Sequence, residues 1–171
     1  SSNHKIQDID IHIAFYMTHF YKHHLTNEIM KFISMCGDFG MSWLIVILIT
    51  NMIDQTRTMS IDMLIALIAA TLIGQVTIKS LVRRKRPCHT YPEVQLLITT
   101  PSDLSFPSGH TTSSFACSTV MMLYNPILGI IGYIYAILTA ISRLYLFVHY
   151  LSDVVTGVIL GITIGIITYL L

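Results

Sequence analysis

Five long apolar runs, separated by short polar connectors, constrain the fold of this chain more than any other feature. They cover residues 29–53, 61–82, 111–124, 127–143 and 151–171, and the first is interrupted at Gly37 and Asp38. A helix needs about 20 mainly apolar residues to cross a hydrocarbon core of about 30 Å. The runs therefore predict an all-α, polytopic membrane helix bundle with about five spanning helices.

The composition supports a membrane protein. Hydrophobic residues make up 53% of the chain and charged residues only 11%, whereas soluble domains carry roughly 25% charged residues. No linker or internal repeat divides the 171 residues, so we expect a single membrane-embedded domain over residues 1–171. The net charge of +1 says little about partners, but residues 83–86 form a block of four basic side chains.

Residues 8–24 have the pattern of an amphipathic helix that lies along the membrane surface. Asp8, His12, His19 and His23 project from one side of this helix, and apolar side chains cover much of the other. Three histidines on one face could bind a metal ion. No carboxylate or cysteine completes a convincing ligand set, so a polar face turned to water or headgroups is the preferred interpretation.

Basic side chains form a stripe where the second predicted span leaves the membrane. If the helix continues to Arg86, then Lys79, Arg83 and Arg86 stand at positions i, i+4 and i+7, and Pro87 ends the helix. Such a stripe suits phosphate, because arginine offers a planar fork and lysine a point charge. The alternative is attraction to anionic lipid headgroups without chemistry.

A polar loop over residues 88–107 leads into Ser108, Gly109 and His110 at the start of the third predicted span. Unpaired backbone N–H groups and the helix dipole make such a start an anion site. A histidine at this place can donate a proton to a leaving oxygen. An ordinary helix cap with an interfacial histidine explains the same pattern.

A third polar group lies between the last two spans. Arg143, His149 and Asp153 sit in an apolar stretch, and His149 and Asp153 are four residues apart, which on a helix places them on one face. A carboxylate that holds one imidazole nitrogen leaves the other free to attack or to carry a proton. Arg143 has the wrong angular offset to share that face, so the chain must bend between Arg143 and His149 if they are to meet. A buried ion pair and an interfacial arginine would be the non-functional interpretation.

If each predicted span crosses the membrane once, the three groups lie on the same side. The second and fourth spans end on that side, and the third and fifth spans begin there. Three cations can then neutralise a phosphate and its transition state, while one histidine attacks phosphorus and the other protonates the leaving oxygen. Acidic residues are too few on this side to hold magnesium. The sequence thus predicts phosphoryl transfer without a metal or any other cofactor.

At this point the motifs resemble those of the type 2 phosphatidic acid phosphatase superfamily. Their spacing is Lys79, six residues, Arg86 and Pro87; residues 107–110; and Arg143, five residues, His149, three residues, Asp153. The span count resembles the short bacterial members, including undecaprenyl pyrophosphate phosphatases and phosphatidylglycerophosphatase B.

The resemblance implies that His149 is the nucleophile, Asp153 its orienting carboxylate and His110 the acid/base. It also implies a phosphate-binding set: Lys79, Arg86, Ser108, Gly109 and Arg143. One departure is Phe147, where many relatives have glycine, which bears on the shape of the pocket wall.

The resemblance further implies that the substrate is a lipid phosphate or pyrophosphate drawn from the bilayer, with membrane lipids as surroundings. Family members generally work at the external membrane face, whereas the basic residues on the site side favour the cytoplasm by the positive-inside rule. We follow the family here. The alternatives are a phosphotransferase of the same superfamily and a non-enzymatic anion-binding or transport protein. No nucleic-acid partner is expected, and the sequence specifies neither the lipid nor an oligomeric state.

Overall fold

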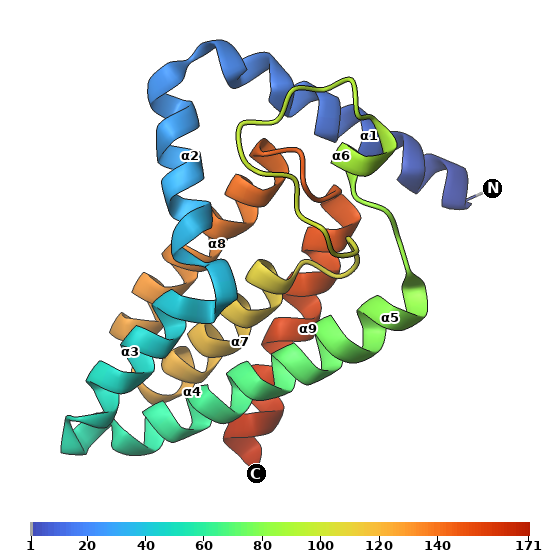
Figure 1. Cartoon of the computed structure of the whole chain (residues 1–171). Coiled ribbons are helices and arrows are strands. Elements are labelled where there is room, and N and C mark those ends of the chain that lie inside the picture. Colours follow the sequence, from blue (N-terminus) through green and yellow to red (C-terminus); the bar gives the residue numbers. More distant parts are fainter. Residues whose placement is uncertain (1) are drawn as a thin grey trace.

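The computed structural model describes residues 2–171, and no strand occurs among these residues (Figure 1). The bounds of the α-helices are α1 Ser2–Thr18, α2 His24–Cys36, α3 Met41–Asn51, α4 Arg57–Ala70, α5 Lys79–Val82, α6 Pro87–Thr90, α7 Gly109–Tyr124, α8 Pro126–Tyr145 and α9 Leu151–Leu170. The prediction of an all-helical chain is confirmed.

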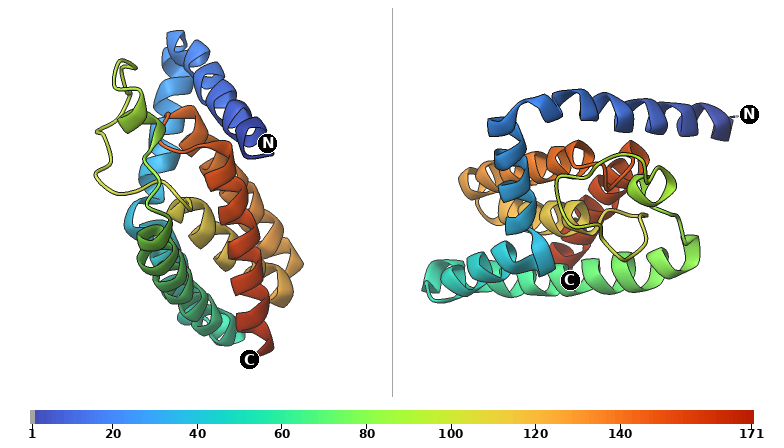
Figure 2. Two further views of the ribbon diagram at one scale, coloured as in Figure 1. Left: turned by 90° about the vertical axis from the view of Figure 1, so that its right-hand side faces the viewer. Right: turned by 45° about the horizontal axis from the view of Figure 1, so that its top comes forward.

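Helix α1 lies across one end of the bundle, as Figures 1 and 2 show from three directions. It begins before the predicted residue 8 and ends at Thr18, after which a 3₁₀ turn, His19–Lys22, leads to α2. Ala14 is buried in an apolar cluster with residues of the 145–150 segment, whereas His12, His19 and His23 are exposed. One side of α1 therefore packs on the bundle, whereas the three histidines of the predicted helix are exposed, although only His12 lies on α1.

The first predicted span is broken where Gly37 and Asp38 interrupt its apolar run. Helices α2 and α3 meet there at an angle of 51°. Phe39 has φ 54° and Gly40 has φ 67°, both in the left-handed region that stops a right-handed helix. The weak point predicted near Gly37 is therefore a sharp bend between two helices.

The second span continues from α4 through a π-helical segment, Thr71–Ile78, into α5. The prediction that this helix continues to Arg86 is wrong, because Arg83 adopts φ 54° and ends the helix at Val82. Pro87 does not end a helix either: it opens the short helix α6, where its fixed φ and missing N–H are tolerated. Lys79 and Arg86 consequently lie on different elements, and no helical stripe joins them.

Helix α7 is the central element of the bundle. It lies among α9, α8 and α4 (Figure 1) and packs against them. Nearly all of its residues from Thr111 to Met121 are buried. Helix α9 approaches closely because its glycines face α7: a Cβ on Gly161 would lie 2.6 Å from the Thr112 carbonyl oxygen. The apolar core lies between α7 and the first two spans, around Met63, Cys117 and Val120.

The predicted bend between Arg143 and His149 is present. Helix α8 ends at Tyr145 and α9 begins at Leu151. Phe147, between them, has φ 62°, a conformation that glycine adopts without strain. Its ring is fully buried against Phe15 and Tyr91.

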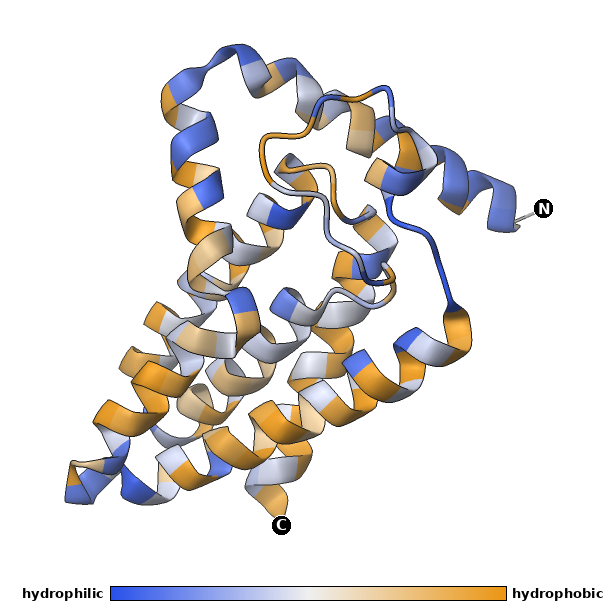
Figure 3. Ribbon diagram, in the orientation of Figure 1, coloured by the Kyte–Doolittle hydropathy of each residue, from blue (hydrophilic) through white to orange (hydrophobic). Residues whose placement is uncertain are grey.

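Among residues 2–171, three helical segments are long and apolar enough to cross a membrane: 54–90, 126–145 and 151–170. The bent pair α2 and α3 makes a fourth if it is one span. Helix α7 has only 16 residues, about 24 Å at 1.5 Å per residue, and falls short of the hydrocarbon thickness. Apolar residues cover much of the outer helices, while the end that carries α1 is more hydrophilic (Figure 3).

Candidate active site

Most of the predicted site residues gather around one cavity of about 1180 Å³. Lys79, Arg86, Gly109, His110, Arg143 and His149 line its polar part. Leucine and isoleucine side chains from α3, α4 and the π-helical segment after α4 line its other part, namely Leu44, Leu64, Leu67, Ile68 and Leu72. The three groups that the sequence places on one membrane face thus meet in a single amphipathic cavity.

His149 lies in the connector between α8 and α9 and is 1% exposed. Its Nε2 is 2.9 Å from a guanidinium nitrogen of Arg86, which also donates to the Val148 carbonyl oxygen at 2.9 Å. Because arginine can only donate, Nε2 must accept, and the ring proton therefore sits on Nδ1. Burial and the nearby charges of Arg86 and Arg143 hold the pKa of His149 well below its usual range. The ring is therefore a neutral imidazole with its lone pair on Nε2.

Asp153 faces the other side of this imidazole. The distance from His149 Nδ1 to the Asp153 carboxylate is 3.5 Å, and Nδ1 has no hydrogen-bond partner among the described residues. Asp153 lies in the first turn of α9, three residues after the N-cap Tyr150, and His149 precedes this cap and is outside the helix. The side chains of His149 and Asp153 therefore lie side by side, as predicted, but not on one face of a continuous helix.

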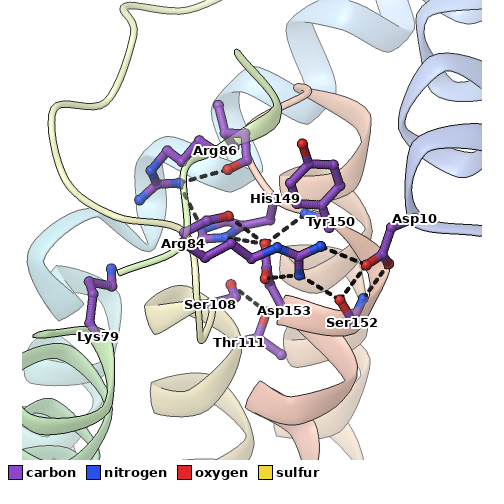
Figure 4. Close-up of polar contacts among 12 residues, drawn as sticks. Asp10, Lys79, Arg84, Arg86, Ser108, Thr111, His149, Tyr150, Ser152 and Asp153 are labelled. Atoms are coloured by element: carbon purple, nitrogen blue, oxygen red, sulfur yellow. Dashed lines mark hydrogen bonds and ion pairs between the residues drawn. The ribbon is translucent and has the colours of Figure 1, made fainter. Parts of the chain in front are cut away.

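Arg84 fixes Asp153 in place. Its guanidinium donates to Asp153 at 2.8 Å and to Asp10 of α1 at 2.8 Å, and both carboxylates are buried (Figure 4). Ser105 and the backbone N–H of Tyr150 also donate to Asp153. Arg84 thereby ties the N-terminal helix to the carboxylate beside His149.

The cations Lys79 and Arg86 both bind Asp103, a residue of the loop between α6 and α7. Lys79 Nζ is 2.6 Å and an Arg86 nitrogen 2.7 Å from the two carboxylate oxygens. Lys79 and Arg86 are buried, while the Asp103 side chain is 51% exposed. Although burial alone would raise it, the hydrogen bond from Lys79 and the charge of Arg86 lower the pKa of Asp103 from 3.8 to about 2.

Arg143 and His110 meet at the backbone and side chain of Ser34 on α2. Arg143 donates to the Ser34 hydroxyl at 2.7 Å, and its Nε has no partner among the described residues. His110 Nε2 is 3.2 Å from the Ser34 carbonyl oxygen and 2.9 Å from the carboxylate of Asp38. The α2 end of the bent span therefore forms one wall of the site.

The start of α7 carries the remaining predicted residues. Ser108 is fully buried behind the cavity wall, with its hydroxyl 2.9 Å from that of Thr111 and its N–H donating to the Asp153 carbonyl oxygen. Gly109 lines the cavity and has no room for a side chain, because a Cβ would lie 1.5 Å from the amide nitrogen of Gln75. Among the predicted residues, Ser108 and Asp153 thus support the cavity from behind.

Four charged residues that make contacts in the site were not predicted from the sequence: Asp10, Asp38, Arg84 and Asp103. Asp10 and Asp38 lie far from the motifs along the chain, and only the tertiary fold brings them near. Arg84 stands inside the basic block, where composition alone does not distinguish it from Arg83 and Lys85. The predicted influence of Phe147 on the pocket wall is not seen, since its ring packs on α1 and does not line the cavity.

The structure is that of a helical membrane protein in which buried cations surround His149 of the α8–α9 connector and His110 at the start of α7. Residues 60–171 match the PAP2 superfamily. The chain therefore belongs to the PAP2 superfamily.

Individual relatives agree with this membership. The chain is 42% identical over 100 residues to a decaprenylphosphoryl-5-phosphoribose phosphatase of Mycobacterium tuberculosis, covering 53% of this chain and 49% of that protein. It is 32% identical over 136 residues to an undecaprenyl-diphosphatase of Sulfolobus acidocaldarius, covering 79% of this chain and 65% of that protein. The chain thus matches about half to two thirds of the length of these relatives.

The fold is similar to that of two solved structures. A transmembrane PAP2-type phosphatidylglycerolphosphate phosphatase from Bacillus subtilis superposes with a TM-score of 0.79 at 25% identity, covering 96% of this chain and 84% of that one. LpxE from Aquifex aeolicus superposes with a TM-score of 0.75 at 26% identity, covering 85% and 86%.

Proposed function

We propose that this chain is an integral-membrane lipid phosphatase that hydrolyses a lipid phosphate or pyrophosphate through a phosphohistidine intermediate. The observation that carries the proposal is the contact of Arg86 with His149 Nε2, beside the buried cations Lys79 and Arg143. A neutral nucleophile next to three positive charges is suited to attack an anionic phosphate.

In the first step, the His149 Nε2 lone pair forms the N–P bond while the bond from phosphorus to the leaving oxygen breaks. His110 gives its proton to that oxygen, and a lipid alcohol or lipid monophosphate departs. Arg86 transfers its hydrogen bond from Nε2 to a phosphate oxygen, where Lys79 and Arg143 share the negative charge. Asp153 stabilises the positive charge that His149 acquires.

In the second step, a water molecule attacks phosphorus, and His110 accepts its proton. The N–P bond breaks, which returns the electron pair to Nε2 and releases inorganic phosphate. The backbone N–H groups at the start of α7, beside Gly109, face the transferred group in this scheme. Ser108 supports the start of α7. Direct binding of phosphate by Ser108 would require its buried hydroxyl to rotate away from Thr111.

The apolar part of the cavity supports a lipid substrate. Leucine and isoleucine side chains of α3 and α4 continue from the cationic part toward the lipid-facing surface. A substrate with a long tail can keep that tail in apolar surroundings while its phosphate reaches the three cations. The names of the relatives favour a polyprenyl phosphate, a polyprenyl diphosphate or phosphatidylglycerophosphate as substrate, and phosphatidic acid is a further lipid of the proposed class.

We also propose that α7 crosses the membrane, as the third of five crossings along the chain, and that the site faces the exterior. A short, polar α7 is compatible with crossing, because other helices and not lipid surround it. An external site is tested with a Glu93→Cys variant, which places a thiol on the exposed loop beside the cavity. A membrane-impermeant maleimide should label this variant in intact cells above the level of the parent chain, and labelling only after lysis would reverse the orientation.

The activity is tested by phosphate release from the detergent-solubilised chain. The panel contains undecaprenyl pyrophosphate, phosphatidylglycerophosphate, phosphatidic acid and diacylglycerol pyrophosphate, each with and without an acceptor lipid. Release of free phosphate from at least one lipid is expected. Phosphorylated acceptor in place of free phosphate would make the chain a phosphotransferase, and tight binding without turnover would make it an anion-binding protein.

A further inference from the structure

The bend of the first span places one carboxylate on the second histidine of the site. Asp38 stands two residues after the end of α2 at Cys36, and its Oδ1 lies 2.9 Å from His110 Nε2. The next two residues, Phe39 and Gly40, both have positive φ. Strained backbone of this kind persists where surrounding structure holds it, and it is concentrated at functional sites.

The backbone of the bend also lies against the imidazole. A Cβ on Gly37 would come within 2.6 Å of His110 Cδ2, so only glycine allows this approach. The Ser34 carbonyl oxygen lies on the same ring nitrogen at 3.2 Å. The bend therefore determines the position of the His110 ring, although Asp38 and His110 are 72 residues apart in the sequence.

We propose that Asp38 is the positioning residue of the acid/base His110: it accepts a hydrogen bond from Nε2–H, fixes the ring and stabilises its protonated form. Both oxygens on this side, from Asp38 and Ser34, can only accept, so Nε2 carries a proton in either charge state. Nδ1 has no hydrogen-bond partner among the described residues and is the atom that exchanges the catalytic proton. This role rests on the proposed lipid phosphatase activity.

In the first chemical step, the proton on Nδ1 moves to the leaving oxygen as the P–O bond breaks, and the imidazolium becomes a neutral imidazole. In the second step, the same nitrogen takes a proton from the attacking water. Asp38 keeps its hydrogen bond to Nε2–H throughout and is never protonated. It opposes the positive charge of Arg143, which acts electrostatically on His110 and disfavours the imidazolium.

The charge balance around His110 explains why such a carboxylate is needed. Apart from Asp38, the charged or titratable groups lining the cavity are Lys31, Lys79, Arg86, Asp103, Arg143 and His149. The Asp103 carboxylate is bound to Lys79 and Arg86, and the Glu28 carboxylate is bound to Lys31. Both negative charges are therefore already paired with cations other than His110. Asp38 is the carboxylate in contact with His110 among residues 2–171.

The test compares Asp38→Asn with the wild-type chain on two lipids that carry the same acyl chains. The leaving group of phosphatidic acid is the alcohol diacylglycerol, which needs a proton from a general acid. The leaving group of diacylglycerol pyrophosphate is the phosphate of phosphatidic acid, which is stable as an anion and needs this proton much less. For Asp38→Asn, kcat/KM should fall about 10- to 100-fold on phosphatidic acid, a part of the 10²–10⁴-fold that general acid catalysis supplies. It should fall less than about threefold on the pyrophosphate.

A pH profile gives a second readout that a purely structural role would not move. Without the carboxylate, the imidazolium loses a favourable charge, so the alkaline fall of kcat/KM on phosphatidic acid should move to lower pH by about one unit. Asp38→Glu should restore part of the activity and of the profile. Asp54→Asn, which removes an exposed carboxylate paired with Arg57 at the other end of the bundle, is the matched control and should change neither.

Equal losses on both lipids with an unchanged pH profile would overturn the assignment of Asp38, as would an Asp38→Asn chain with wild-type activity. A wild-type chain that releases phosphate from neither lipid would instead overturn the proposed function on which the assignment rests. Detergent-solubilised Asp38→Asn should unfold within a few degrees of the wild type, and a collapse of folding that Asp38→Glu does not rescue would also contradict a positioning role.

Discussion

Asp103 occupies the two cations that are proposed to bind phosphate, so its removal should improve phosphate binding. Its carboxylate oxygens lie 2.6 Å from Lys79 Nζ and 2.7 Å from an Arg86 nitrogen. A phosphate entering the cavity must replace these contacts. Asp103→Asn keeps the shape of the side chain and removes the negative charge that competes with phosphate.

The magnitude follows from the pKa of Asp103, which is about 2 instead of 3.8. That difference corresponds to about 2 kcal/mol of favourable interaction for the charged form. The side chain is 51% exposed, so solvent and salt reduce the value to about 1 kcal/mol. Because the pKa is lowered, the interaction is complete above pH 3.8 and is lost only as the pH falls toward 2. Competition with phosphate is therefore fully present at neutral pH.

The assay is competitive inhibition of lipid hydrolysis by inorganic phosphate at pH 7. A change of about 1 kcal/mol predicts an inhibition constant about fivefold lower for Asp103→Asn. The difference should shrink at high ionic strength, because salt screens the half-exposed carboxylate. Asp54→Asn serves as the control for removal of an exposed acid. Unchanged or weaker phosphate inhibition of Asp103→Asn would refute the competition and would indicate that Asp103 organises the loop instead.

Three further predictions follow from the site. Phe147→Gly should relieve about 1 kcal/mol of left-handed strain but lose about 3–5 kcal/mol of aromatic packing, so thermal unfolding in detergent should show a net destabilisation of about 2–4 kcal/mol. Arg84→Ala leaves the buried Asp10 and Asp153 without their shared cation and should lower the free energy of unfolding by about 3–5 kcal/mol; an unchanged melting curve would contradict this. Because the pKa of His149 lies well below 6.5, the neutral nucleophile persists as the pH falls through 6.5, and kcat/KM should decline only at clearly lower pH.

The sequence predicted the convergence of the site because crossing a bilayer reduces the possible topologies to a count of spans. Arg143 and His149 meet His110, Lys79 and Arg86 for that reason. It also predicted the bend before His149 from the angular offset of Arg143. The first inference depends on which side of the membrane a residue lies, and the second on which face of a helix it occupies. The pattern of apolar residues indicates both.

Local geometry was predicted less well. The predicted helical stripe from Lys79 to Arg86 was wrong, because Arg83 adopts a left-handed backbone conformation that ends the helix. Nothing in the sequence of the basic block indicates this conformation. The contacts of Asp38 and Asp103 depend on how a bend and a loop pack against distant helices. Phe147 carried a usable signal: the resemblance to the superfamily implies glycine at that place, and glycine is typical of a positive φ, which the structure has at 62°.

The central claim is that His149 becomes phosphorylated during turnover. The direct measurement is rapid quenching of the solubilised chain with a substrate lipid labelled in its transferable phosphate, followed by peptide mapping of the label. We predict an acid-labile, base-stable label on the peptide that contains His149, absent from His149→Ala. A chain that hydrolyses the lipid without labelling, or that carries the label on another residue, would contradict the mechanism.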